Sequence, residues 1–179
     1  MAGDGMYEFL LEEMAPREML AGLMARSIKQ DAGSFSWRNY FVADGRGVIG
    51  QGVIGMIHAF PAAALQQEER DVLPQDRVQI LDPIDQAQDW ASFLINSVAV
   101  RPQHHRQGIA TSLMEMAIDQ AKSGGFARVS ANVWEDNAAG RSLCEKLGFG
   151  VQMRVELPPH PGLGHTGGSL VMIRQLDLS

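Results

Sequence analysis

One stretch of the chain, residues 92–123, combines residue types and a spacing that could bind an anion. Residues 93–100 form a largely apolar run of strand length, and Pro102 ends it because proline lacks a backbone N–H. A short basic loop leads to Gly108, and apolar residues then recur at helical spacing. A helix N-terminus carries unpaired N–H groups and partial positive charge. Phosphate binding is one interpretation, and an ordinary strand-to-helix turn is the other.

Two residues of the loop favour the anion-binding interpretation. Gly108 would let the backbone approach a phosphate closely, and Arg106 adds a positive charge. This stretch contains no G-x-G-x-x-G, and the chain contains no G-x-x-x-x-G-K-[ST]. The two common nucleotide-binding loops are therefore not the explanation for it.

Two motifs occur in a defined order along the chain. Residues 105–110 read H-R-Q-G-I-A after V-R-P, and residues 137–149 read N-A-A-G-R-S-L-C-E-K-L-G-F. Together they resemble the [QR]-x-x-G-x-[GA] and N-x-x-[AG]-x-x-[LF]-Y-x-[KR]-x-G-F patterns of the GNAT superfamily of acyl-CoA-dependent N-acyltransferases. His105 departs from the usual Gln or Arg, and Cys144 stands in the tyrosine position. The resemblance covers roughly residue 36 to the C-terminus.

The resemblance implies an α/β (α+β) fold, a mixed, mostly antiparallel twisted sheet with helices on both faces. Its two central strands, here about residues 91–100 and 127–134, would splay at a bulge to admit the pantetheine arm of acetyl-CoA. GNAT proteins usually begin with a strand, whereas residues 1–5 of this chain already resemble the middle of the helix that follows it. We therefore expect the first strand to be missing.

The resemblance also assigns the co-substrate site. The backbone around Val98 to Val100 would pair with pantetheine, and the loop N–H groups would hold the pyrophosphate. The residues so implied are Val98, Ala99, Val100, His105, Arg106, Gln107, Gly108, Ile109, Ala110, Thr111 and Asn137. Asn137 is equally well read as a helix N-cap.

Amine acylation needs a neutral amine, a polarised thioester carbonyl and a proton for the leaving thiolate. A backbone N–H near Val98 or Ala99 could polarise the carbonyl. Cys144, in the place of the family tyrosine, is a candidate acid, although a free cysteine also packs as a small apolar side chain. Ser142 should lie on a different face of the helix and is a poor substitute.

The general base that would deprotonate the amine is harder to assign than the acid. The strand positions where the family often has a carboxylate hold Asn96 and Ser97. His58 on a preceding strand is one candidate, although a lone strand histidine is more often a packed, hydrogen-bonded residue. A water chain relayed by Asn96 is as plausible. The remaining candidates are Asp89, Glu135 and His165. The proposed catalytic set is Cys144, Asn96 and His58.

The histidines do not form a metal-ligand pattern. His104 and His105 are adjacent, which suits neither helical nor strand ligation, and His160 and His165 lie in a loop rich in glycine and proline. No metal is expected.

The elements that must position these residues follow from periodicity. Residues 1–30 read as helical, 40–43 and 48–60 as a hairpin around a turn at 44–47, and 61–88 as a polar surface excursion that could wall the acceptor pocket. A short helix could occupy residues 62–70 of this excursion. The later elements are a strand at 93–100, a helix at 109–123, a strand at 127–134, a helix at 137–147, and strands at 149–157 and 169–176.

Composition bounds the function class. A chain of 179 residues with 45% apolar content predicts a single domain over residues 1–179, and the resemblance implies that this is an acyl-CoA N-acyltransferase domain. The net charge of −6 argues against nucleic-acid binding, and no apolar run is long enough to span a membrane. Cys144 is the only cysteine, which suits a cytoplasmic location.

We therefore expect an N-acetyltransferase that passes the acetyl group of acetyl-CoA to a small-molecule amine by direct attack in a ternary complex. A protein or peptide amine is an alternative acceptor. A non-catalytic acyl-CoA-binding or sensing module is an alternative of another class, and release of CoA with an amine would discriminate between them. The family resemblance allows a homodimer but indicates no interface.

Overall fold

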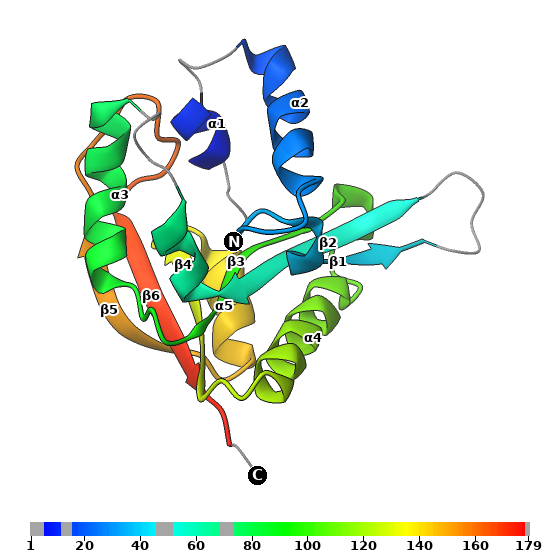
Figure 1. Ribbon diagram of the computed structural model, residues 1–179. Coiled ribbons are helices and arrows are strands. Elements are labelled where there is room, and N and C mark those ends of the chain that lie inside the picture. Colours follow the sequence, from blue (N-terminus) through cyan, green and yellow to red (C-terminus); the bar gives the residue numbers. More distant parts are fainter. Residues whose placement is uncertain (1–5, 12–15, 46–51, 69–73, 178–179) are drawn as a thin grey trace.

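The computed structural model describes residues 6–11, 16–45, 52–68 and 74–177. Within them the chain forms a six-stranded sheet with the order β1-β2-β3-β4-β6-β5 (Figure 1). Every neighbouring pair is antiparallel except β3 and β4, which are parallel. The mixed, mostly antiparallel sheet predicted from the sequence is confirmed. The strands are β1 (Tyr40–Asp44), β2 (Val53–Pro61), β3 (Phe93–Val100), β4 (Arg128–Trp134), β5 (Gly150–Glu156) and β6 (Gly168–Gln175).

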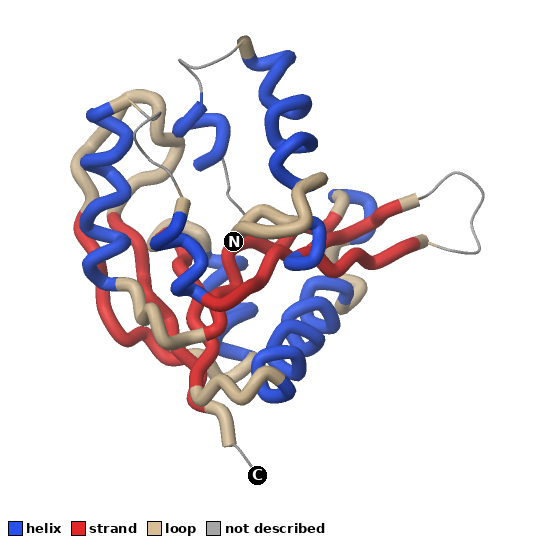
Figure 2. The backbone as a smooth tube through the Cα atoms, viewed as in Figure 1, coloured by secondary structure: helices blue, strands red, loops and turns tan. Residues whose placement is uncertain are grey.

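Helices lie on both sides of this sheet (Figure 2). Helices α4 and α5 lie on one side, and α1 and α2 on the other (Figure 1). Short 3-10 helices connect some elements. The helices are α1 (Met6–Leu11), α2 (Arg17–Ile28), η1 (Trp37–Asn39), η2 (Ala62–Gln67), α3 (Gln75–Ala87), η3 (Pro102–His104), α4 (Ile109–Ser123) and α5 (Ala138–Lys146).

The predicted elements of the second half of the chain are confirmed to within about one residue at each end. The hairpin is confirmed as β1 and β2. Of the predicted turn at residues 44–47, Asp44 ends β1 and residues 46 and 47 lie outside the described part, as do residues 48–51 of the predicted second strand. In the described residues no strand precedes β1, and residues 6–11 are helical, as a missing first strand requires. Residues 1–5, on which that expectation also rested, are outside the described part.

The segment at residues 61–88 is the main correction to the sequence prediction. It was expected to be a polar surface excursion, but it contains η2 and the 13-residue helix α3, which packs against β5. Pro74 sits at the N-cap, where no helical hydrogen bond is lost, although Pro83 lies inside the helix. Burial of Arg77 and Ile80 shows that tertiary packing outweighs the local cost of that proline.

Helix α4 is placed by close contact with the sheet. Its buried face packs on β2, β3 and β4 in the main core and consists of Leu113, Met114, Ala117, Ile118 and Ala121. Gly55 on β2 makes the approach close, because a Cβ there would lie 3.1 Å from Ile109 Cγ2 and 3.3 Å from Leu113 Cδ1. The first turn of α4 is thereby held near the end of β3.

A β-bulge interrupts the pairing of β2 with β3. His58 pairs with Ser97 while the next residue, Ala59, pairs with Ile95, so Asn96 is an extra residue on β3. A bulge bends a strand and increases its twist. The bend occurs immediately after Ile95, which is also where β3 ceases to pair with β4.

His58 holds this bulge from the side of the sheet opposite α4. Its ring is fully buried and stacks on Tyr40 at a centroid distance of 4.1 Å. Nε2 donates to the carbonyl oxygen of Ser34 (2.7 Å), so Nδ1 accepts from the amide nitrogen of Asn96 (3.1 Å). Burial lowers the pKa of His58 to about 4, against the contribution of the Ser34 hydrogen bond. The ring is therefore neutral at neutral pH.

The pKa of His58 predicts a specific pH dependence of folding. Between the unfolded value of 6.5 and about 4, the unfolded chain binds a proton at His58 that the folded chain does not, so stability falls as pH falls. The loss attributable to this residue reaches roughly 3 kcal/mol at pH 4. Urea unfolding measured from pH 7 to pH 4 should therefore show a steeper pH dependence for the wild type than for His58→Gln. Equal slopes would contradict burial of a neutral ring.

Candidate functional site

The two central strands, β3 and β4, pair over a short segment and then separate. Residues 93–95 of β3 pair in parallel with residues 129–131 of β4, and beyond them the described part of β3 pairs only with β2. Asn96 and Asn132 are the first residues after the last pair. The edge of β3 that faces β4 therefore offers backbone groups, from Asn96 onward, to something other than a strand.

The place where β3 and β4 separate, after Ile95 and Ala131, forms a fork. A pocket of about 590 Å³ lies beside this fork. The end of β3, the loop before α4, the first turn of α4 and one face of α5 form its walls. The lining residues are Val98, Val100, His104, His105, Arg106, Gly108, Ile109, Ala110, Thr111, Asn137, Ala139, Gly140, Ser142, Leu143 and Lys146. Both sequence motifs therefore contribute to one pocket.

The loop before α4 presents backbone N–H groups to this pocket. Arg106 (φ 63°) and Gly108 (φ 82°) both adopt left-handed backbone conformations. For arginine this conformation is strained, and such strain is concentrated at functional sites. No side chain caps α4, so the N–H groups of its first turn are left for another acceptor. His105 folds back and donates from Nε2 to the carbonyl oxygen of Val100 (2.8 Å), which ties the loop to the strand.

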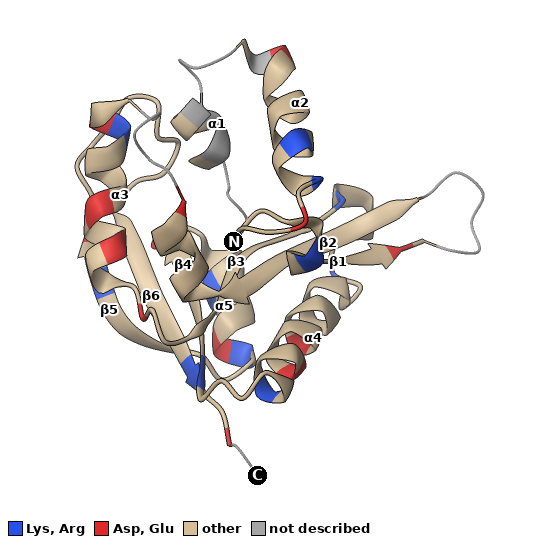
Figure 3. Cartoon of the chain, viewed as in Figure 1, with Lys and Arg blue, Asp and Glu red and all other residues tan. Residues whose placement is uncertain are grey.

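The charge of the pocket is opposite to that of the chain. Its ionisable lining residues, among those described, are His104, His105, Arg106 and Lys146, with no carboxylate among them, whereas the whole chain has a net charge of −6. Acidic and basic residues are interspersed elsewhere on α4 and α5 (Figure 3). A basic pocket at an uncapped helix N-terminus suits a phosphate-bearing ligand.

Asn137 serves as the N-cap of α5 as well as lining the pocket. Its Oδ1 accepts from the backbone N–H of Gly140 at 2.8 Å. A Cβ at Gly140 would lie 3.1 Å from the side chain of Asn137, so glycine leaves room for the cap. The N-cap interpretation of Asn137 is confirmed.

The pocket brings together all the expected binding residues except Ala99 and Gln107. Ala99 is exposed, and its Cα lies opposite Met56 in the ladder with β2. The Gln107 side chain donates to the carbonyl oxygen of Gln103 at 3.3 Å. Several lining residues of α5 were not predicted from the sequence, although their helical spacing places them on one face: Ala139, Ser142, Leu143 and Lys146. His104 and Gly140 also line the pocket without having been predicted.

Cys144 lies on a different face of α5 from the pocket lining. It is fully buried in the main core, and burial raises the pKa of its thiol to about 12. The interpretation of Cys144 as a small core residue is therefore confirmed, and its role as candidate acid is not supported by its position. Ser142 lies on a different face of α5 from Cys144, as expected, but it is the Ser142 face that lines the pocket.

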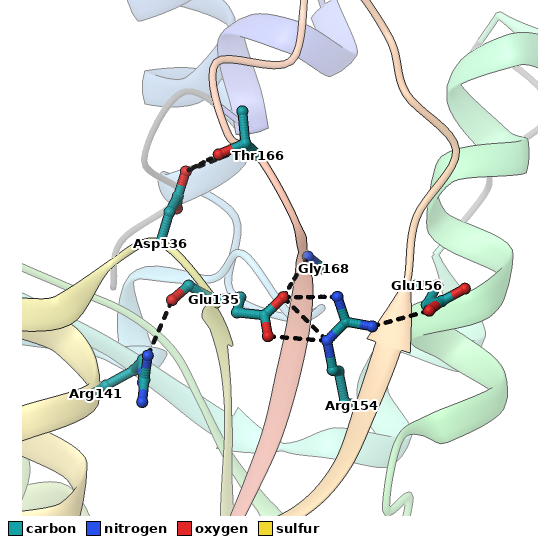
Figure 4. Close-up of polar contacts among 7 residues, drawn as sticks. All are labelled: Glu135, Asp136, Arg141, Arg154, Glu156, Thr166 and Gly168. Atoms are coloured by element: carbon teal, nitrogen blue, oxygen red, sulfur yellow. Dashed lines mark hydrogen bonds and ion pairs between the residues drawn. The ribbon is translucent and has the colours of Figure 1, made fainter.

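Two of the remaining candidates for the general base, Asp89 and Glu135, are paired with arginines. Asp89 accepts from Arg128, and this contact holds the pKa of its carboxyl below the usual value. Glu135 accepts from Arg154 at 2.9 and 3.0 Å, which likewise lowers its pKa, and also from the backbone N–H of Gly168 (Figure 4).

The loop between β5 and β6 is fastened to the end of β4. Asp136 accepts from the backbone N–H of Thr166 (2.8 Å), as Figure 4 shows, and contacts Nδ1 of His165 (2.8 Å). The ring of His165 stacks on Trp134 at 4.6 Å. These contacts fix the segment between β4 and α5, and with it the position of Asn137.

The described residues contain no group of three or more His, Cys, Asp or Glu side chains placed to hold a metal ion. Among the helices whose placement is described, none has the length and apolar character needed to cross a membrane.

Comparison with known proteins gives the family. A model of the Acetyltransferase (GNAT) family matches residues 11–149. The ribosomal protein bS18-alanine N-acetyltransferase of Escherichia coli K12 is 40% identical over 53 residues, which span 30% of this chain and only 36% of that relative.

Solved structures agree on the fold. An N-acetyltransferase from Staphylococcus aureus Mu50 superposes with a TM-score of 0.64 at 20% identity, covering 92% of this chain and 85% of that one. The NatC complex bound to Gag peptide and CoA gives 0.53 at 19% identity, covering 90% and 92%. Because the family model spans most of the chain and the same fold recurs in these structures, the chain belongs to the GNAT family of acetyltransferases.

Proposed function

We propose that the protein transfers the acetyl group of acetyl-CoA to an amine by direct attack in a ternary complex. The observation that carries the proposal is the pocket itself, which joins an uncapped helix N-terminus, a left-handed loop and the unpaired edge of β3. Bound acetyl-CoA would supply the thioester. The amine nitrogen bonds to the acetyl carbon as the carbon–sulfur bond breaks, and the surplus proton ends on the thiol.

The pocket supports an assignment of roles to the residues that would hold the co-substrate. The N–H groups from Arg106 to Thr111 would hold the pyrophosphate, and Arg106 with Lys146 would add charge. The backbone of Val98, Ala99 and Val100 would pair with the pantetheine arm along the free strand edge. The remaining members of the binding set are His105, Gln107, Gly108, Ile109, Ala110 and Asn137.

The proposed catalytic residues take different roles. A backbone N–H near the bulge would polarise the carbonyl. Asn96 is held by His58, so His58 acts as a positioning residue: its two ring nitrogens already contact Ser34 and Asn96. Cys144 packs the core under the site, and its high pKa makes it a weak proton donor.

A small-molecule amine is the first candidate acceptor, and a peptide α-amine is the second. The second is favoured by the local similarity to the bS18-alanine N-acetyltransferase and by the fold shared with NatC, which was solved with a Gag peptide. A non-catalytic acyl-CoA-binding module would bind acetyl-CoA without releasing CoA. A cytoplasmic location and a homodimer stay predictions.

Titration calorimetry with acetyl-CoA tests the binding loop. We expect micromolar binding to the wild type, weakening in Arg106→Ala and loss in Gly108→Glu, which places a carboxylate among the N–H groups. Gly125→Glu is the matched control: Gly125 has φ 75° and open space around it, like Gly108, but lies just beyond the other end of α4. An equal loss of acetyl-CoA affinity in both glycine variants, or no binding of acetyl-CoA to the wild type, would contradict the assignment of this loop as the pyrophosphate site.

Replacement of Cys144 separates a core role from acid catalysis. Cys144→Ala should lower the free energy of unfolding by about 1 kcal/mol, because a buried side chain is truncated. It should change kcat by less than about tenfold. A loss in kcat beyond about 100-fold with unchanged acetyl-CoA affinity would instead indicate direct proton donation by the thiol.

A further inference from the structure

One buried hydrogen-bond acceptor beside the fork, Oδ1 of Asn132, has no partner among the described residues. The side-chain oxygen of Asn132 is shielded from solvent and accepts no hydrogen bond among the described residues. Asn132 directly follows the last pair of β4 with β3, and the residue as a whole is partly exposed. It alternates with the core residues Ala131 and Val133, so its side chain lies on the face away from α4 and α5.

The orientation of this carboxamide follows from a backbone group. The carbonyl oxygen of Asp89 can only accept, so the atom of Gln88 that contacts it (3.3 Å) is Nε2, which also donates to Ser130 Oγ (3.2 Å). Oε1 of Gln88 must then accept, and it does so from Nδ2 of Asn132 at 2.9 Å. The oxygen of Asn132 is left directed away from Gln88.

Asn96 is oriented in the same way on the neighbouring strand. The carbonyl oxygen of Ser34 fixes the tautomer of His58, and His58 fixes the amide nitrogen of Asn96. Both residues that follow the last β3–β4 pair are thus asparagines whose amide nitrogens point to buried partners. A carboxamide oxygen accepts an N–H hydrogen bond but does not take up a proton at neutral pH.

The carboxylates near the ends of these strands are poorly suited to be bases. Asp89 accepts from Arg128, Glu135 from Arg154, and Asp136 from the backbone N–H of Thr166. Each of these contacts lowers the pKa of the carboxyl group, which makes it a weaker base. An alkylammonium would find an acceptor at Asn132 but little help in losing its proton.

We propose that Asn132 Oδ1 accepts an N–H of the acceptor, and that the site takes an amine that is much less basic than an alkylamine. This rests on the acetyl transfer proposed above. At pH 7 an arylamine is almost wholly neutral and about a tenth of a peptide α-amine, with a pKa near 8, is neutral, whereas an alkylamine with a pKa near 10.4 is almost wholly protonated. Asn132 is a substrate-positioning residue in this account.

The test measures CoA release with p-anisidine, an alanine-initiated peptide and phenethylamine. At pH 7 the kcat/KM for p-anisidine or the peptide should exceed that for phenethylamine by at least about 100-fold. The first two acceptors distinguish a small molecule from a protein N-terminus. From pH 6.5 to 9, kcat/KM should stay level with p-anisidine but rise about tenfold per pH unit with phenethylamine, following the neutral amine.

Variants test the residue itself. Asn132→Leu should lower kcat/KM at least about tenfold with the preferred acceptor while leaving acetyl-CoA affinity intact. Gln152→Leu, which removes an exposed carboxamide from β5, should change neither. Asn132→Asp supplies a carboxylate and should flatten the pH profile with phenethylamine.

The outcomes separate the two proposals. If the wild type does not bind acetyl-CoA, the proposed function fails and this inference fails with it. If acetyl-CoA binds but phenethylamine reacts as fast as p-anisidine and the peptide at pH 7, only this inference is overturned. If acetyl-CoA binds and none of the three amines releases CoA, this inference is overturned and the non-catalytic acyl-CoA-binding module is favoured over acetyl transfer. Full activity in Asn132→Leu would also overturn it.

Discussion

The structure depends on the point at which β3 and β4 cease to pair. A continuous parallel ladder would consume the backbone groups of Val98 to Val100 and close the pocket. The extra residue Asn96 in the ladder with β2 bends β3 at that point, and the strands separate after residues 95 and 131. The first turn of α4 and one face of α5 then border the gap.

Leaving the backbone N–H and C=O groups of a strand unpaired costs free energy, and the packing around the fork offsets this cost. Below the fork, α4 buries an apolar face on the sheet, and Cys144 fills part of the same core. On the other face of the sheet there are two hydrogen-bond relays, each of which starts at a backbone carbonyl oxygen. One passes from Ser34 through His58, and the other passes from Asp89 through Gln88. The same relays orient Asn96 and Asn132, so the contacts that support the fork also determine which chemical groups face it.

Much of the fold and of the binding loop could be predicted from sequence, because both depend on local signals. Helical periodicity and the stop after α4 are local, and so is the glycine that precedes its first turn. Helix α3 was missed, since Pro74 and Pro83 suggested a loop and only contact with distant parts of the chain shows why the helix forms.

The acceptor side of the site was beyond sequence reasoning for a similar reason. Asn132 and Gln88 are 44 residues apart, and no local pattern links them. Cys144 was placed in the site by its motif position, whereas the rotation of α5 puts it in the core and Ser142 in the pocket. Motifs led to most residues of the pocket, and the fold alone showed how the opposite face of the sheet is arranged.

The most direct test of the central claim is hydrogen exchange of backbone amides with and without acetyl-CoA. If the free edge of β3 and the first turn of α4 hold the co-substrate, exchange should slow in peptides covering residues 97–101 and 106–112. Peptides from the exposed edge strand β5 should be unaffected. Protection confined to other segments, or none with acetyl-CoA at saturating concentration, would contradict the account.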